Sequence, residues 1–184
     1  MNDTPDLVFQ SFIKLLEAHT YKEVSISALC KAAGISRRTF YRWYNGIEDL
    51  VVALVRKDFI DPVRQTRSVL PLDEIKSSTL LMTERGINTV NENKVLYQKL
   101  LDYNGYKSLA ETIIDETYLL SLEIFASYIE NVTELEYAAY EISAAHAMVL
   151  DRWLRGQFNV TPKQLARFTT DWLYAHFKSL KYTE

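Results

Sequence analysis

The chain has 184 residues with a formal net charge of −3, and 48% of its residues are hydrophobic and 24% charged. This length and composition suit one or two globular domains with a buried core, and they exclude a repeat or low-complexity chain. A single cysteine, Cys30, excludes an intramolecular disulfide framework. No apolar run approaches about eighteen residues and no charged-then-apolar leader follows Met1, so we expect a cytoplasmic protein with no membrane segment.

Charge is unevenly distributed along the chain. Residues 1–57 contain 8 Lys and Arg against 6 Asp and Glu, whereas residues 58–184 contain 13 against 18. The N-terminal excess is too small to indicate a nucleic-acid-binding surface by itself. Any such prediction therefore rests on the local cluster of arginines within residues 37–42.

The first predicted helix runs from Pro5 to Glu17. Thr4 is a suitable N-cap, and Pro5 suits the first turn. Apolar residues at helical spacing form a wide stripe, made of Val8, Phe9, Phe12, Ile13, Leu15 and Leu16. We expect this helix to cover the two short helices that follow.

The next stretch predicts two short helices that turn on Gly34. The first, Ala28 to Ala33, carries small apolar residues on one face, and either Ser25 or Ser27 could cap it. A glycine just past a helix can adopt the left-handed conformation that closes the last carbonyls. Ser36 is a suitable N-cap for the second helix.

The second short helix is rich in cations and aromatic groups. Phe40 and Tyr44 lie four residues apart and can anchor it from beneath. The other positions supply guanidinium, hydroxyl and indole groups that suit phosphates and base edges: Arg37, Arg38, Thr39, Tyr41, Arg42 and Trp43. Such a pair of helices predicts a helix-turn-helix, whose second helix enters the major groove of DNA. A merely solvated basic face is the alternative for this helix considered alone.

The stretch SISALCKAAGISRRTFYRWYNGIEDLV, residues 25–51, resembles the DNA-binding domain of the TetR family of transcriptional regulators. The resemblance rests on Ala33, Gly34, Ile35, Ser36, Thr39, Phe40, Tyr41, Tyr44, Glu48 and Leu50. It implies a homeodomain-like domain of three helices, a double-stranded DNA operator as partner, and a homodimer. It also implies that Ser25 and Ser27 approach DNA phosphates. The family usually has a lysine where this chain has Ile47, which bears on one backbone contact.

A fourth helix is predicted after the turn at Asn45 and Gly46. Glu48 and Asp49 suit its positive N-terminal end, and Pro62 is expected to kink or shorten it. In the resembling family this helix links the DNA-binding domain to the regulatory domain. A tilt of it would change the separation of the two recognition helices in a dimer.

The remainder of the chain predicts helices only. Turn and capping residues separate five of them: Asp73 to Val90, Lys94 to Tyr103, Tyr106 to Ile129, Glu134 to Arg155 and Pro162 to Leu180. The predicted fold is therefore all-α, with about nine helices. We expect a DNA-binding domain at residues 1–60, with its helix-turn-helix at 25–44, and a helical ligand-binding and dimerisation domain at 61–184.

The last two predicted helices look unlike a surface pair. Helix 134–155 is apolar nearly all round, and helix 162–180 repeats apolar residues at spacings of three and four. They could form a four-helix bundle with a second copy through Tyr140, Ala144, Ala147, Met148, Phe168, Trp172 and Phe177. An intramolecular core is the alternative. The stretch WLRGQFNVTPKQL, residues 153–165, is similar to the C-terminal domain of a small TetR-family branch common in low-GC Gram-positive bacteria.

A small-molecule pocket among the C-terminal helices is implied by the same resemblance. Aromatic residues with polar tips could form its walls: Tyr97, Tyr103, Tyr106, Tyr118, Tyr128 and Trp153. Each of them could equally be an ordinary core residue. Branches of the family also respond to protein partners, and the sequence does not distinguish the two kinds of effector.

Catalysis finds little support in the sequence. His19, His146 and His176 are scattered, and no paired ligands at metal spacing, nucleophile motif or nucleotide fingerprint occurs. We therefore expect no catalytic site, no metal and no cofactor. His146 is interpreted as a buried hydrogen-bonding residue in preference to a ligand contact, and Cys30 as a core thiol in preference to a redox sensor.

These features favour a sequence-specific DNA-binding regulator, a repressor that obstructs polymerase at a pseudo-palindromic operator. The alternative is a helical dimer that acts mainly through protein–protein interaction, with DNA binding weakened or lost through changes such as Ile47. An enzyme is the third and most distant reading.

Overall fold

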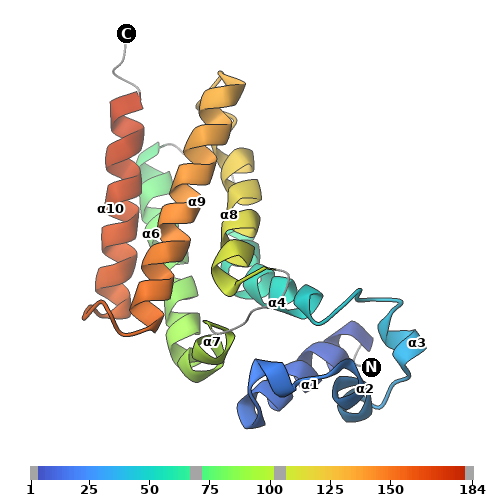
Figure 1. Ribbon diagram of the computed structural model, residues 1–184. Coiled ribbons are helices and arrows are strands. Elements are labelled where there is room, and N and C mark those ends of the chain that lie inside the picture. The colour runs from blue at the N-terminus through green and yellow to red at the C-terminus, as the bar shows by residue number, and fades with distance from the viewer. Residues whose placement is uncertain (1–3, 67–71, 102–106, 181–184) are drawn as a thin grey trace.

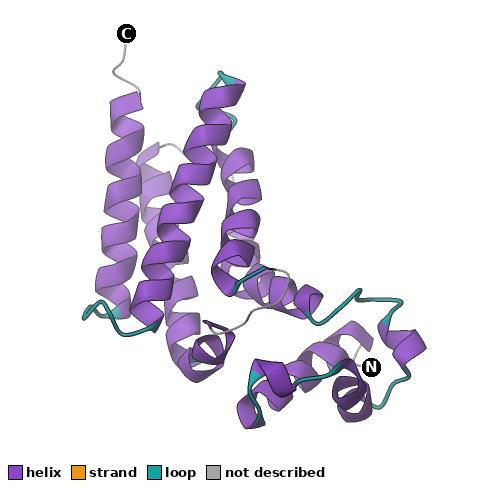
Figure 2. Cartoon of the chain, viewed as in Figure 1, coloured by secondary structure: helices purple, strands orange, loops and turns teal. Residues whose placement is uncertain are grey.

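The computed structural model describes residues 4–66, 72–101 and 107–180, and every regular element in these ranges is a helix (Figures 1 and 2). The all-α prediction is confirmed. The first elements are α1 (Thr4–Ala18), the 3₁₀ turn η1 (Tyr21–Glu23), α2 (Ile26–Ala33), α3 (Arg37–Phe40) and α4 (Glu48–Val55). The later elements are η2 (Arg56–Ile60), α5 (Asp61–Thr66), α6 (Leu72–Glu92), α7 (Lys94–Leu101), α8 (Leu109–Phe125), α9 (Val132–Leu154) and α10 (Pro162–Leu180).

Helices α1, α2 and α3 form the N-terminal unit around one apolar core. Val8, Phe12 and Leu16 of α1 are fully buried, as are Leu29 of α2 and Phe40 of α3. The predicted stripe on α1 joins this core, where α1 packs against α2 and also against α7. In Figure 1, α3 lies at the outer tip of this unit, on the side away from α10.

A single rod built from α4, η2 and α5 leaves this unit and enters the C-terminal helices. Its middle section is a π-helical turn, in which the N–H of Asp61 donates to the carbonyl of Arg56. Pro62 explains the wider turn, since proline has no N–H for the carbonyl of Asp58 and its ring clashes with that carbonyl in a regular α-helix. The helix is therefore widened next to Pro62 and continues beyond it.

The C-terminal helices pack as two pairs, α8 with α9 and α6 with α10. Figure 1 shows these four helices running alongside one another, with α7 beneath them near the N-terminal unit. Side chains on their facing surfaces are apolar, and they include Leu120, Leu150, Leu154 and Leu165. None of the described helices combines the length and apolar character that a membrane-spanning segment requires.

Two polar attachments hold the N-terminal unit and the rod to the C-terminal helices. The Lys99 ammonium on α7 donates to the carbonyls of Leu16 (2.6 Å) and Glu17 (2.7 Å), which are end groups that α1 cannot satisfy itself. The Arg56 guanidinium binds both oxygens of Glu116 on α8, at 2.7 and 2.9 Å. The N-terminal unit and the rod are therefore each tied to the C-terminal helices.

Several helix boundaries differ from prediction, and the clearest have a visible cause. Helix α2 begins two residues early, at Ile26, because Ser25 is the residue that caps it. Helix α3 ends at Phe40, and i→i+3 bonds continue the turn, including Trp43 N–H to the Phe40 carbonyl at 2.9 Å. Helix α8 begins at Leu109, since Ser108 and Glu111 form a capping box, and it ends at Phe125.

Candidate nucleic-acid interface and C-terminal cavity

The turn between α2 and α3 is fixed by backbone geometry. Gly34 has φ 65° and ψ 31°, and its N–H donates to the carbonyls of Cys30 and Lys31. The N–H of Ile35 also donates to the Cys30 carbonyl, at 3.0 Å. This is the closing pattern of a helix that ends on a left-handed residue, and it favours glycine for lack of a Cβ. Ile35 then packs against the core, so α3 leaves at a defined angle.

Serine hydroxyls begin both short helices. The Ser25 Oγ accepts from the N–H of Ala28 at 3.1 Å, and the Ser36 Oγ accepts from the N–H of Thr39 at 3.0 Å. The hydroxyls of Ser36 and Thr39 also lie 2.9 Å apart. Ser25, Ser27 and Ser36 are all exposed, so the N-terminal ends of α2 and α3 are open to solvent.

The outer face of α3 and the following turn presents a cluster of cations and aromatic rings. Arg37, Arg38 and Arg42 are exposed, and none of them forms an ion pair with any residue that the structure describes. Tyr41 is 48% exposed and Trp43 is 50% exposed, which is a large exposure for aromatic side chains. Thr39 is half-buried between them and the core. The face is therefore uncompensated in charge and available for contact.

One internal contact arranges this face. The Arg37 guanidinium lies 3.5 Å from the Tyr41 hydroxyl, one helical turn away, and this contact raises the pKa of Arg37. The guanidinium therefore stays charged and is held beside the ring. Arg38 and Arg42 project from the same short segment without such a tether.

The inner face of α3 is anchored as predicted. Phe40 is fully buried, and its ring centroid lies 5.6 Å from that of Tyr44. The Tyr44 hydroxyl donates to the carbonyl of Pro5 at 3.1 Å, so it joins the turn after α3 to the start of α1. A helix of only four residues is unstable alone, because its few backbone hydrogen bonds cannot stabilise it. The packing of Phe40 and Tyr44 provides that stability.

Ile47 lies against the core, in the position before Glu48. It offers no side-chain cap to α4, whereas Asp49 accepts from the Asn45 backbone N–H at 2.7 Å and closes the turn. Isoleucine at this position buries its apolar side chain but carries no positive charge. It therefore cannot make the contact with the DNA backbone that a lysine would make.

Cys30 lies within the core beneath the turn. Burial raises the pKa of its thiol, which keeps it protonated and unreactive at neutral pH. These properties agree with a core thiol.

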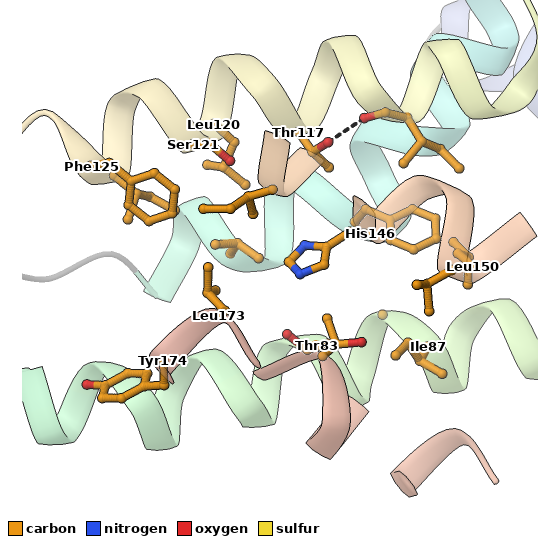
Figure 3. Close-up of a pocket in the computed structure, with 18 of the residues that line it drawn as sticks. Thr83, Ile87, Thr117, Leu120, Ser121, Phe125, His146, Leu150, Leu173 and Tyr174 are labelled. Carbon is orange, nitrogen blue, oxygen red and sulfur yellow. Dashed lines mark hydrogen bonds between the residues drawn. The ribbon is translucent and has the colours of Figure 1, made fainter. Parts of the chain in front are cut away.

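A cavity of about 210 Å³ lies among the C-terminal helices (Figure 3). Its walls come from η2, α5, α6, α8, α9 and α10. The lining residues are Phe59, Val63, Thr83, Gly86, Ile87, Ile113, Thr117, Leu120, Ser121, Ile124, Phe125, Tyr128, Ile142, His146, Val149, Leu150, Leu165, Thr169, Leu173 and Tyr174. None of these residues carries a formal charge at neutral pH apart from the titratable His146.

His146 points into the space between α8 and α6 in Figure 3. Burial lowers the pKa of this imidazole to about 4, so it is neutral at physiological pH. Its ring has no hydrogen-bond partner among the residues that the structure describes, which contradicts its interpretation as an internally satisfied core histidine. The prediction failed because α9 places this position on the cavity wall.

The aromatic residues predicted to line a pocket are dispersed, and only Tyr128 lies on the cavity wall. Tyr97 is buried elsewhere, where its hydroxyl donates to Asp58, and Trp153 donates to the Val160 carbonyl at 2.9 Å. Tyr118 packs edge-on against Tyr140 and borders a separate hollow beside α4. Those three predictions are wrong for this cavity because each ring is held by another partner. Tyr103 and Tyr106 lie outside the described residues.

Sequence reasoning did not find the cavity's own polar residues. Thr117 and Ser121 lie four residues apart on α8, beside the apolar Leu120 and Phe125, and all four line the cavity. Hydroxyls at helical spacing inside an otherwise apolar helix face were the available signal.

The side chains predicted for a dimer interface divide into two groups. Tyr140, Met148, Phe168 and Trp172 are exposed, at 55%, 48%, 51% and 74%. Ala147 is buried within the chain, so it faces the wrong way for a subunit contact and that prediction is wrong. Ala144 is half-buried, and the side chain of Phe177 lies outside what the structure describes. A groove between α9 and α10 is lined in part by Phe168 and Trp172 and shares His146 with the cavity.

No cluster of histidine, cysteine, aspartate or glutamate that could hold a metal ion occurs in the described ranges. The arrangement as a whole is a capped helix-turn-helix with an open basic face, joined by a rod to a helical bundle. It defines the class of helix-turn-helix DNA-binding proteins.

The chain belongs to the TetR family of bacterial regulatory proteins. Residues 13–54 match the family described as "Bacterial regulatory proteins, tetR family", and residues 78–174, more than half of the chain, match "Transcriptional regulator C-terminal region". The members of this family are transcriptional regulators, and the recognition made from residues 25–51 is confirmed.

Two matches to proteins named DhaS illustrate the likeness. The chain is 24% identical over 97 residues to the HTH-type dhaKLM operon transcriptional activator DhaS of Lactococcus lactis, a match that spans 53% of this chain and 48% of that protein. The chain thus matches about half the length of this curated relative. A solved structure named dihydroxyacetone kinase operon activator DhaS has a TM-score of 0.60 at 21% identity, covering 95% of this chain and 96% of that one.

Two further solved structures share the fold. A tetR-family transcriptional regulator from Streptomyces coelicolor has a TM-score of 0.63 at 17% identity, covering 98% of this chain and 83% of that one. The TetR family repressor AlkX from a Dietzia strain has a TM-score of 0.59 at 19% identity, covering 94% and 97%. At these identities the likeness concerns the fold alone.

Proposed function

We propose that this protein is a sequence-specific transcriptional regulator that binds a pseudo-palindromic operator as a homodimer in the cytoplasm. The observation that carries the proposal is the outer face of α3, where Arg37, Arg38 and Arg42 are exposed without acidic partners. Cations left uncompensated on a rigidly anchored helix suit phosphates and guanine edges. The DNA-binding domain would comprise residues 1–60, with the remainder serving regulation and dimerisation.

Each exposed group on this face has a proposed role. Arg37, Arg38 and Thr39 contact base edges or nearby phosphates from the start of α3. Tyr41, Arg42 and Trp43 hold the DNA backbone from the turn that follows, together with Ser25, Ser27 and Ser36 at the helix starts. A bidentate arginine–guanine pair would contribute about 1–3 kcal/mol of discrimination.

The exposed apolar faces of α9 and α10 support dimerisation. Tyr140, Met148, Phe168 and Trp172 would be covered by the same surface of a second copy, in a four-helix arrangement. Two recognition helices related by a twofold axis read half-sites about one helical turn apart or somewhat more. This symmetry is why the proposed operator is a pseudo-palindrome.

The cavity is the proposed effector site, and the rod is its connection to DNA. Phe59 and Val63 of the rod line the cavity, and the same rod continues as α4 into the N-terminal unit. A ligand that displaces these side chains would tilt α4 and alter the separation of the two recognition helices. Ligand affinity and operator affinity are then linked reciprocally.

Repression by obstruction of polymerase is the first candidate outcome of operator binding. Activation is the second candidate, and it is favoured by the printed name of the relative DhaS, a transcriptional activator. Both outcomes use the same DNA-binding face, so the sign of regulation depends on operator position.

The experiment that tests DNA binding directly is the salt dependence of affinity for a duplex of mixed sequence. Wild-type affinity should fall steeply with salt, and Arg42→Ala should reduce the slope by about one unit because one phosphate contact is lost. Lys14→Ala is the matched control, since this exposed lysine lies on α1, away from the proposed face. A folded dimer with no salt-dependent affinity would instead indicate a protein that acts through protein–protein contacts, as the apolar Ile47 would also favour.

A further inference from the structure

The cavity differs from an ordinary packing defect in its polar groups. Thr83, Thr117, Ser121, His146 and Thr169 all face it, among walls that are otherwise apolar. An empty apolar cavity has no need of such groups, and buried polar groups normally have partners. Their presence indicates an occupant that is mostly apolar and carries at least one polar atom.

Two of these hydroxyls are already committed to the protein. The Thr117 Oγ1 donates to the Ile113 carbonyl at 2.6 Å, as Figure 3 shows. The Ser143 Oγ donates its proton to the Ala139 carbonyl at 2.8 Å, so in the 3.4 Å pair of Ser121 with Ser143 the donor is Ser121. Neither hydroxyl has a proton left for a ligand.

His146 is a polar group of the cavity wall that remains open to a ligand. It projects from the middle of α9 to the centre of the cavity, and its ring has no hydrogen-bond partner among the described residues. A neutral imidazole has one N–H donor and one nitrogen acceptor. A hydroxyl can satisfy either function and a carbonyl can accept from the N–H.

The walls also exclude formal charge. Among the residues that the structure describes, the lining contains no Lys, Arg, Asp or Glu that could neutralise an ionised ligand. The Lys76 ammonium lies 5.2 Å from the ring centroid of Tyr174, a lining residue, but it is paired with Asp171 at 2.9 Å. Transfer of a carboxylate or ammonium into this site would carry the full desolvation cost without a compensating partner.

We propose that the cavity binds an uncharged, mostly apolar small molecule with one hydroxyl or carbonyl group, which His146 recognises by hydrogen bonding. This inference rests on the proposed function, since it names the chemical class of the effector. The ligand would also contact Phe59 of the rod, which lies on the same cavity wall. Recognition by His146 and contact with the rod would thus occur in one bound position.

The test measures binding by calorimetry on the full-length protein without DNA. Two matched sets of probes are used: n-octanol with octanoate and octylammonium, and para-cresol with para-toluate and para-xylene. At least one neutral polar probe should bind, and its charged counterpart should bind at least about tenfold more weakly. In the aromatic set para-cresol should bind more tightly than para-xylene, because only the phenol reaches His146 with a hydroxyl.

Three variants connect the preference to His146. His146→Phe should reduce affinity for the neutral polar probe by about tenfold, the usual value of one hydrogen bond, and should leave para-xylene affinity unchanged. His146→Gln keeps a donor and an acceptor and should retain the preference. His19→Gln is the control, because His19 is exposed and distant in sequence from every cavity-lining residue.

The outcomes separate this inference from the proposed function. Tighter binding of the charged probes, binding of none of the probes by folded protein, or an unaltered preference in His146→Phe would overturn the ligand class. Loss of DNA affinity in protein that still binds the neutral probe would instead overturn the regulator while leaving the site intact. Operator binding without any probe binding would overturn the ligand class and leave the regulator intact.

Discussion

The buried pair of Tyr97 and Asp58 joins the rod to α7, and replacement of the tyrosine by phenylalanine tests how much that joint contributes. Asp58 is only 9% exposed, and the Tyr97 hydroxyl donates to its carboxylate. Burial raises the pKa of Tyr97, so it remains a donor at all ordinary pH values. Tyr97→Phe leaves the ring, its packing against Phe59 and the cavity-facing side of the rod in place, but removes the donor.

The expected cost follows from the charge of the acceptor. A hydrogen bond to an ionised group contributes about 1.5–3 kcal/mol, and the unpaired carboxylate is left in a site with little water. We therefore expect Tyr97→Phe to lower the free energy of unfolding by about 2 kcal/mol at neutral pH. For a chain of this size that corresponds to a fall of roughly 4–8 °C in Tm.

The cost should also depend on pH, with a sign that the structure determines. Burial raises the pKa of Asp58, while the Tyr97 hydrogen bond and Lys57 lower it, and burial is the largest of the three effects. The folded state therefore holds this proton more tightly than the unfolded state. Stability falls as pH rises from the unfolded pKa of Asp58 through its folded pKa, and is constant above. Removing the hydroxyl raises the folded pKa further, so the penalty is complete above that pKa and shrinks as pH falls below it.

Urea unfolding at about pH 8 and about pH 5 measures this difference, because the ordinary Asp pKa lies near 4. Tyr118→Phe is the matched control, since the half-buried Tyr118 hydroxyl has no hydrogen bond to any described residue, and it should cost less than about 0.5 kcal/mol. In an Asp58→Asn background the cost of Tyr97→Phe should lose its pH dependence. Equal costs for the two phenylalanine variants, or a pH-independent cost for Tyr97→Phe, would refute the reasoning.

Four further predictions concern the interface and the subunit contact. Gly34→Ala should lower the free energy of unfolding by about 1 kcal/mol in urea melts, because φ is 65° and no atom lies near a new Cβ; Gly34→Asn should cost less. Ser36→Ala should cost about 1 kcal/mol through the lost cap, whereas Ser36→Asp should keep stability and weaken DNA binding in filter assays. Arg38→Ala should weaken operator binding tenfold or more by fluorescence anisotropy without lowering Tm, and unchanged affinity would count against its proposed role. Trp172→Asp should shift the dimer toward monomer by light scattering, while the exposed Val132→Asp should not; a dimer retained in both would exclude the α9–α10 contact.

The N-terminal unit could be predicted almost completely because its physical signals are local. Caps, the left-handed glycine and the i, i+4 pair of Phe40 and Tyr44 each act within a few residues. What the sequence did not indicate is that α3 ends at Phe40. The tight turn after it depends on the tertiary bond from Tyr44 to Pro5, which no local pattern contains.

The C-terminal cavity could not be predicted because it depends on how distant helices meet. In the sequence, Trp153 and Tyr97 look the same as aromatic residues that bind a ligand. In the structure Trp153 is bonded to Val160, 7 residues away, and Tyr97 to Asp58, 39 residues away. Ala147 is small enough to allow close contact between two helices. Whether that contact lies within the subunit or between subunits depends on which side of α9 the residue occupies, and Ala147 lies on the buried side. The π-helical turn could be predicted in part. Pro62 predicts that the helix is disturbed at this point, but the sequence alone does not show that the helix widens and continues.

The central claim is that the face of α3 reads DNA sequence as part of a symmetric dimer. The most direct measurement is selection of bound duplexes from a random pool by the full-length protein at near-physiological salt, read by sequencing. The account predicts an enriched inverted repeat with half-sites about one helical turn apart or somewhat more, and loss of that enrichment in Arg38→Ala. A folded, dimeric wild-type protein that enriches no sequence would contradict it.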